Sequence, residues 1–290
     1  MIPDGFEPDA ALSGFVSIGA SLTTVSATAA EKFESAANDI AAQAFSDPSR
    51  RQRIVRCTPV AAVDEGCARS FVATFGRRAW RRPLKDDEID RYTGLATQGA
   101  ALLGDFWQGL GFALSGLLQS PYFLYRVELG QPGPKPGLRA FDAWELASRL
   151  SFFLSNSTPD DALLDAAEKS ALTGPHGLRE QAERLLASPR GQVVVRSFFY
   201  ELMRLDDLED LKQSPAEFPR ATRTVGPAMQ EETLQLLAAI AASADGDLRQ
   251  ALDAPFTFVN QELGQLYARS TGCRGRERPR PSSSTTSRPT

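Results

Sequence analysis

The chain has 290 residues, of which 42% are hydrophobic and 23% are charged. This is ordinary globular usage, which excludes a largely disordered chain, and no apolar run approaches the roughly 20 residues needed to span a bilayer. The net charge is −4: residues 269–290 carry six arginines and one glutamate, or +5, and the remainder carries 26 basic against 35 acidic residues, or −9. An acidic body argues against nucleic acid as a partner, because phosphate binding needs a basic face.

The sequence offers little of the chemistry that enzymes use. The single histidine, His176, lies in a turn, and no Cys-x-x-Cys-His haem-attachment motif is present. We therefore expect no metal site and no cofactor in this chain, and we find no catalytic motif. Cys57 and Cys67 enclose a short loop. They either form a disulfide, if the chain is exported, or are two unrelated thiols.

Apolar residues recur at helical spacing along almost the whole chain, and there is no sustained alternating strand pattern and no phosphate loop. The sequence predicts a mostly α-helical fold, an irregular or orthogonal multi-helix bundle with no sheet beyond a short hairpin. The segment 105–119 is apolar on most faces, so it should be buried. The predicted helices cover residues 26–45, 65–82, 105–119, 141–154, 160–171, 176–187, 189–205, 219–243 and 259–267.

Several helices are predicted to begin with a hydroxyl residue followed by proline, which suits an N-cap and the first helical position. In the pair Thr158-Pro159, Thr158 is the predicted cap, and Asp161 stands at the position of a capping-box acid. The helix dipole then accounts for Asp160 and Asp161 without catalysis. The pairs are Ser120-Pro121, Ser188-Pro189, Thr158-Pro159 and Ser214-Pro215.

Two groups of arginines have a structural and a functional interpretation. Around Trp80, four arginines either form an anion clamp or pair with the acidic residues of the next helix, and the short sequence distance favours pairing. A second basic patch between residues 50 and 56 is interpreted as a solvated face. The first group is Arg77, Arg78, Arg81 and Arg82, facing Asp86, Asp87, Glu88 and Asp90; the second is Arg50, Arg51, Arg53 and Arg56.

Two further arginines, Arg126 and Arg149, stand in aromatic or aliphatic runs. We expect them to be half-buried and paired with Glu128, Glu145 or Asp161, because arginines next to a core are rarely left unpaired. The alternative is that one of them faces a cleft and binds an anionic ligand.

Three strings carry a resemblance to a known family. They are Cys-x3-Phe-x3-Phe-Gly-Arg-Arg-Ala-Trp-Arg-Arg-Pro-Leu from Cys67, Leu-Leu-Gln-Ser-Pro-Tyr-Phe-Leu-Tyr-Arg-Val-Glu ending at Glu128, and Glu-Leu-Ala-Ser-Arg-Leu-Ser-Phe-Phe-Leu-x4-Pro-Asp-Asp from Glu145. They resemble exported or envelope-associated proteins of planctomycetes and myxobacteria. Those proteins are built from consecutive domains of unknown function, with number 1592 at the centre and number 1595 before it.

The resemblance implies a domain layout: a partial N-terminal helical segment at 1–56, a 1595-like helical domain at 57–130 and a 1592-like helical domain at 131–268. It also implies an extracytoplasmic setting, in the periplasm or envelope, where Cys57 and Cys67 should pair. The match stops after Tyr267, so we expect this chain to be a fragment. We expect residues 269–290 to be a disordered basic tail, and a frameshift would explain it.

Two classes of function follow from these observations. The first is a helical structural or interaction module that binds a protein partner in the envelope; the resemblance links such modules to c-type cytochromes and polysaccharide-binding domains. The second is a hydrolase of extracellular polymer that uses two carboxylates facing one cleft, roughly 5–9.5 Å apart. We favour the first class. The candidate carboxylates for the second are Glu128, Glu145, Asp160 and Glu232.

Overall fold

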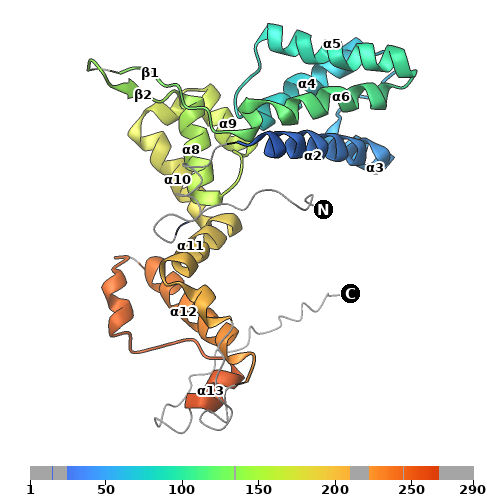
Figure 1. Ribbon diagram of the computed structural model, residues 1–290. Helices are drawn as coiled ribbons and strands as arrows, with labels where there is room; N and C mark the ends of the chain where they lie inside the picture. Colours follow the sequence, from blue (N-terminus) through green and yellow to red (C-terminus); the bar gives the residue numbers. More distant parts are fainter. Residues whose placement is uncertain (1–14, 16–24, 134, 210–221, 244, 268–290) are drawn as a thin grey trace, which may run out of the picture. The chain divides into compact units, whose positions relative to one another are not determined.

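The computed structural model describes residue 15 and residues 25–133, 135–209, 222–243 and 245–267. The described residues are mostly α-helical, which confirms the predicted fold class (Figure 1). Their one sheet is a two-stranded antiparallel hairpin of β1 (Gln131–Pro132) and β2 (Arg139–Ala140). The chain divides into two compact units, Met1–Phe198 and Phe199–Thr290. Among the described helices, none is both long and apolar enough to cross a bilayer.

The first unit begins with a helical layer around α6 (Phe106–Gln119). On its two sides α6 packs against α2 (Ala27–Ser46) and α5 (Asp86–Leu103), as Figure 1 shows. Its predicted burial is confirmed, since Leu110, Ala113 and Leu117 are completely buried. The approach to α5 depends on Gly109, because a Cβ there would lie 2.4 Å from the backbone of Ala100. The remaining helices of this layer are α3 (Pro48–Ile54), α4 (Glu65–Ala79) and α7 (Pro121–Leu124).

A second hydrophobic core lies later in the same unit, between α8 (Ala143–Ser155), α9 (Asp161–Glu168) and α10 (Pro175–Ala187). A short 3-10 turn, η2 (Ala171–Thr173), links α9 to α10. Leu163 and Leu172 are almost fully buried in this core. α11 (Pro189–Leu202) follows α10 and continues into the second unit.

The second unit is organised around α12 (Val225–Ala241). This helix packs against η3 (Leu205–Leu208), η4 (Leu248–Leu252) and α13 (Gln261–Tyr267). Gln230 donates a hydrogen bond of 2.6 Å to the Leu205 carbonyl, and Leu263 is buried.

The hydroxyl–proline helix starts are present in part. Ser120 accepts a hydrogen bond from the Tyr122 N–H, and Ser188 from the Gly191 N–H, so both act as caps. The prediction for Thr158 is wrong: α9 is capped by Asp160, whose carboxylate accepts from the Leu163 N–H at 2.9 Å. A carboxylate at the helix N-terminus also interacts with the dipole, which a threonine hydroxyl does not. The Ser214-Pro215 pair lies outside the described residues, as does the predicted tail at 269–290.

Cys57 and Cys67 form a disulfide, with their Cα atoms 5.7 Å apart. Cys67 lies in the first turn of α4, and Asp64 caps that helix by accepting from the Cys67 N–H at 2.9 Å. The disulfide therefore ties the start of α4 to the loop before it.

Candidate binding site

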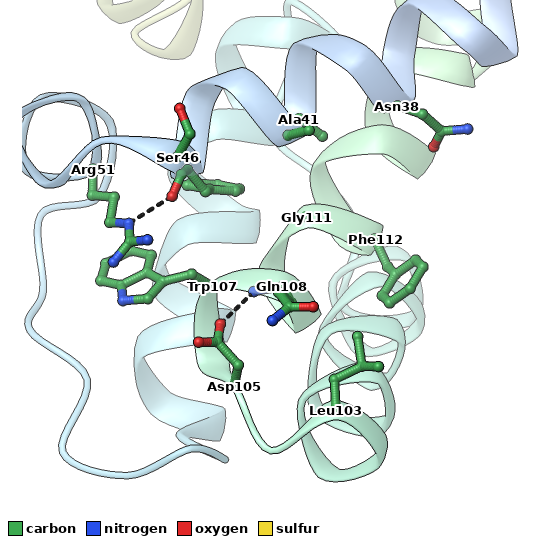
Figure 2. Close-up of a pocket in the computed structure, with 12 residues that line it drawn as sticks. Asn38, Ala41, Ser46, Arg51, Leu103, Asp105, Trp107, Gln108, Gly111 and Phe112 are labelled. Carbon is green, nitrogen blue, oxygen red and sulfur yellow. Dashed lines mark hydrogen bonds between the residues drawn. The ribbon is translucent and has the colours of Figure 1, made fainter.

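A groove runs between α2 and the N-terminal half of α6, and we call it the α2–α6 groove (Figure 2). Its volume is about 430 Å³. At one end of the groove the chain turns from α2 into α3. Asp47 caps α3 by accepting from the Ser49 N–H at 2.8 Å, and Pro48 occupies the first position of the helix. The lining residues are Asn38, Ala41, Ala42, Phe45, Ser46, Arg51, Leu103, Asp105, Trp107, Gln108, Gly111 and Phe112.

Arg51 is the cation of the groove, and two contacts fix its guanidinium. Its Nε donates a 2.7 Å hydrogen bond to the Phe45 carbonyl at the end of α2. Its Cζ lies 4.8 Å from the centre of the Trp107 ring, a cation–π arrangement that Figure 2 shows. Within the described part of the chain, Arg51 makes no ion pair. Its two terminal nitrogens are therefore the part of the side chain left for a ligand.

Further lining residues come from the turn between α5 and α6. Gly104 ends α5 in the left-handed conformation, with φ 64°, which allows the chain to turn sharply. Asp105 then caps α6 by accepting from the Gln108 N–H at 2.8 Å.

On α2, the side-chain oxygen of Asn38 accepts from the Ser115 hydroxyl at 2.5 Å, which orients the Asn38 amide.

Small and apolar side chains supply the rest of the surface. Ala41 and Gly111 add little side-chain bulk to the lining: Ala41 is buried, and a Cβ on Gly111 would meet only Phe45, at 4.0 Å. Leu103 and Phe112 form an apolar rim and remain 45% and 51% exposed. The groove thus combines a fixed cation with an accessible apolar surface.

The described lining holds few ionisable side chains. Asp105 is its only carboxylate, and the lining holds no histidine and no cysteine. Elsewhere in the described residues, no three His, Cys, Asp or Glu side chains group in a way that would hold a metal ion. What remains are hydrogen-bonding groups, one cation and apolar contact area.

Residues 67–128 match the family model described as PSD5, a protein of unknown function (DUF1595). Residues 141–268 match the model described as PSD4, a protein of unknown function (DUF1592). The chain contains both domains of unknown function. No curated protein and no solved structure matches it. The Arg51 end of the groove precedes the DUF1595 segment, while the α6 wall lies within that segment.

Two arginines near the end of α4 join the DUF1595 and DUF1592 segments of the first unit. Arg77 pairs with Asp165 at 2.8 Å and with Glu168 at 2.9 Å, and Arg78 pairs with Asp161. The prediction that these arginines pair with the start of α5 is therefore wrong for Arg77 and Arg78. The helix directs their side chains toward α9. Their partners there are more than 80 residues away in the sequence, so sequence proximity could not identify them.

The other two arginines of this group differ from each other. Arg82 does pair with Glu88 as predicted, through two hydrogen bonds of 2.7 and 2.8 Å. Arg81 is buried and pairs with no acid among the described residues. Its guanidinium donates instead to backbone carbonyls, including those of Tyr122 and Tyr125 at 2.6 Å each. Arg81 therefore holds α7 and the residues after it against the end of α4.

Arg126 and Arg149 differ in their partners, although both were expected to be half-buried and paired with a carboxylate. Arg149 donates to Glu128 at 2.6 Å, one of the three expected carboxylates, but its side chain is 50% exposed. Such a pair contributes about 0.2–1 kcal/mol, not the roughly 3–5 kcal/mol of a buried pair. The expected carboxylate partner of Arg126 is not found among the described residues. Its guanidinium lies 5.3 Å from the centre of the Phe152 ring.

The candidate carboxylates of the first unit all have structural partners. Glu128 pairs with Arg149. Glu145 accepts three backbone hydrogen bonds, from Leu129, Gly130 and Asp142, at 2.7 to 2.9 Å. Partial burial raises the pKa of the Glu145 carboxyl, but these donors outweigh it and leave the pKa below its usual value.

Asp160 and Glu232, the remaining candidates, are also engaged. Asp160 forms two hydrogen bonds with Arg184, at 2.7 and 2.9 Å, and these hold the pKa of its carboxyl below its usual value. Glu232, in the second unit, accepts from the hydroxyls of Thr257 and Tyr267 at 2.7 Å each. Burial and the bond to Glu232 raise the pKa of Tyr267 to about 12. None of the four candidates lines the α2–α6 groove.

Sequence reasoning missed the groove because its residues are distant in the chain. Arg51 was interpreted as part of a solvated patch, and Trp107 and Asp105 received no role. One signal was present: Asp47-Pro48 is a cap followed by a first-position proline, the same kind of start as Ser120-Pro121, and it implies a sharp turn between α2 and α3. That turn is what returns Arg51 to the end of α2.

Proposed function

We propose that this chain is a helical protein-binding module of a larger extracytoplasmic protein, and that the α2–α6 groove is where its partner docks. The observation that carries the proposal is the Arg51–Trp107 stack beside an open apolar surface. A cation fixed by an aromatic ring and a backbone carbonyl, without an acidic partner among the described residues, is arranged to meet a group from outside.

The extracytoplasmic setting is supported by the Cys57–Cys67 disulfide, because such bonds persist in oxidising compartments and are rare in the cytosol. The resemblance of the sequence supports two classes of partner, a c-type cytochrome or a polysaccharide-binding protein. A hydrolase is the weaker proposal. It needs two carboxyls facing one cleft, roughly 5–9.5 Å apart, whereas the groove is lined by Asp105 alone.

Site-specific photocrosslinking in the source cells tests the docking site. A benzophenone amino acid is placed at Gln108, in the groove wall, and in a matched variant at Gln98, an exposed residue of α5 that does not line the groove. We expect a discrete protein adduct from position 108 and none from position 98. Equal adducts from the two positions, or none from either, would contradict docking in the groove.

A further inference from the structure

We infer that the α2–α6 groove recognises an acidic, apolar peptide segment of its partner. One carboxylate of the segment contacts Arg51, and a neighbouring bulky apolar side chain enters the space over Gly111. This inference rests on the proposed docking function and adds the chemistry of the segment that docks.

Charge supports an acidic segment. Residues 46–56 contain Arg50, Arg51, Arg53 and Arg56 against the single acid Asp47, a net charge of +3 in a body that is otherwise acidic. The carboxylate of Asp47 is already used to cap α3. A carboxylate arriving at this end of the groove therefore meets a net positive local charge.

The geometry of Arg51 favours a carboxylate in particular. Its Nε is occupied by the Phe45 carbonyl, which leaves the edge formed by the two terminal nitrogens. That edge can hold both oxygens of a carboxylate in a bidentate pair, and stacking on Trp107 fixes the plane in which the pair forms. A lysine in this place would supply the positive charge, but not the planar pair of N–H donors that binds both carboxylate oxygens.

The apolar part follows from the other walls. Ala41 and Gly111 present almost no side chain, and Leu103 and Phe112 offer exposed apolar area. At about 430 Å³ the groove is near the small end of the roughly 300–1,000 Å³ typical of ligand sites, so it fits one or two side chains. Asp105, which caps α6 close to Trp107, is the one carboxylate of the lining and would repel a second acidic group of the segment.

The test uses the intact chain and fluorescein-labelled, end-blocked 12-residue peptides. The probe peptide has one Glu and one Phe four positions apart in an Ala/Gln background, so that both lie on one helical face. One control peptide replaces Glu with Lys, and a second replaces Phe with Ala. Binding is followed by fluorescence polarisation. We expect the Glu/Phe peptide to bind saturably and both controls to bind at least tenfold more weakly.

Protein variants separate a specific contact from general charge. Arg51→Gln and Arg53→Gln each remove one positive charge, but only Arg51 is stacked on Trp107. We expect Arg51→Gln to weaken peptide binding about tenfold and Arg53→Gln to weaken it less than threefold, with Arg51→Lys giving only partial rescue. Circular dichroism confirms that the variants are folded. Equal effects of the two glutamine variants, a Lys peptide that binds as well as the Glu peptide, or no peptide binding would overturn the inference.

The same crosslinking described above keeps the two proposals apart. If position 108 captures a partner and the crosslinked segment is neutral or basic, docking stands and the acidic-segment inference fails. If position 108 captures nothing, the docking function itself fails. An acidic segment with a bulky apolar residue supports both.

Discussion

The buried Arg81 allows a sharp stability prediction. It follows the end of α4 and lies in the left-handed region, with φ 60°, which costs a residue with a side chain about 1–2 kcal/mol. The cost is offset by four hydrogen bonds from its terminal nitrogens: to Tyr122 and Tyr125 at 2.6 Å, and to Ala79 and Phe123 at 3.2 and 3.4 Å. Burial and the neighbouring Arg126 lower the pKa of Arg81, yet a guanidinium stays charged at neutral pH.

The expected cost of Arg81→Ala can be estimated from these contacts. The two short bonds are charge-assisted and contribute about 1.5 kcal/mol each at the low end of the usual range, so their loss should destabilise the chain by about 3 kcal/mol. Arg81→Gly loses the same bonds but removes the strain of the positive φ, so it should be about 1 kcal/mol more stable than Arg81→Ala. The exposed Arg149→Ala serves as a control and should cost about 0.2–1 kcal/mol.

Guanidinium denaturation at pH 7, followed by tryptophan fluorescence, measures these differences. Trp80 is a suitable reporter, because its indole is buried and donates to the Leu117 carbonyl at 3.1 Å. The reasoning would be refuted if Arg81→Ala unfolded within about 1 kcal/mol of the wild type. An Arg81→Gly variant less stable than Arg81→Ala would show that the positive φ carries no strain.

Three further outcomes are expected. In a double-mutant cycle, Arg78→Gln and Asp161→Asn should couple by less than about 1 kcal/mol, and the coupling should disappear in 1 M salt because the pair is exposed; a salt-independent coupling would contradict this. Cys67→Ser should lower the free energy of unfolding by about 2–3 kcal/mol, from the short loop that the disulfide closes, and unchanged stability would argue against that bond. The folded pKa of Asp160 lies below its unfolded value, so its stabilisation is present at neutral pH and is lost as pH falls through the folded pKa. Arg184→Gln should therefore cost about 0.2–1 kcal/mol at pH 7 and progressively less as the pH falls through the folded pKa of Asp160, whereas a cost that does not change with pH would refute the ionic origin.

The sequence predicted the local structure well, because helices are specified by nearby residues. Helical spacing located α6 and its burial to within a residue, and Ser120-Pro121 marked the start of α7. The error at Thr158 was local as well: the helix begins two residues later than the capping-box spacing predicted, where the carboxylate of Asp160 accepts from the Leu163 N–H. Such errors shift a boundary without changing the fold.

What the sequence could not predict were contacts between distant segments. The partners of Arg77 and Arg78 lie more than 80 residues away on α9, while plausible acids stood close by in sequence. The α2–α6 groove likewise needs Arg51 and Trp107 to meet, which depends on how α3 folds back on α2. Charge and spacing identify such residues as polar or aromatic, but only packing decides what they face.

Filling the α2–α6 groove tests the docking proposal most directly. Gly111→Leu projects a side chain into the groove, and the Cβ would meet only Phe45, at 4.0 Å. Gly94→Leu on α5 is the matched control, since its Cβ would meet only Gln98, at 3.8 Å, and it lies outside the groove. The measurement is the dissociation constant for the partner captured by crosslinking at position 108. The docking proposal predicts at least a tenfold weakening for Gly111→Leu and wild-type binding for Gly94→Leu, and wild-type binding by a folded Gly111→Leu variant would contradict it.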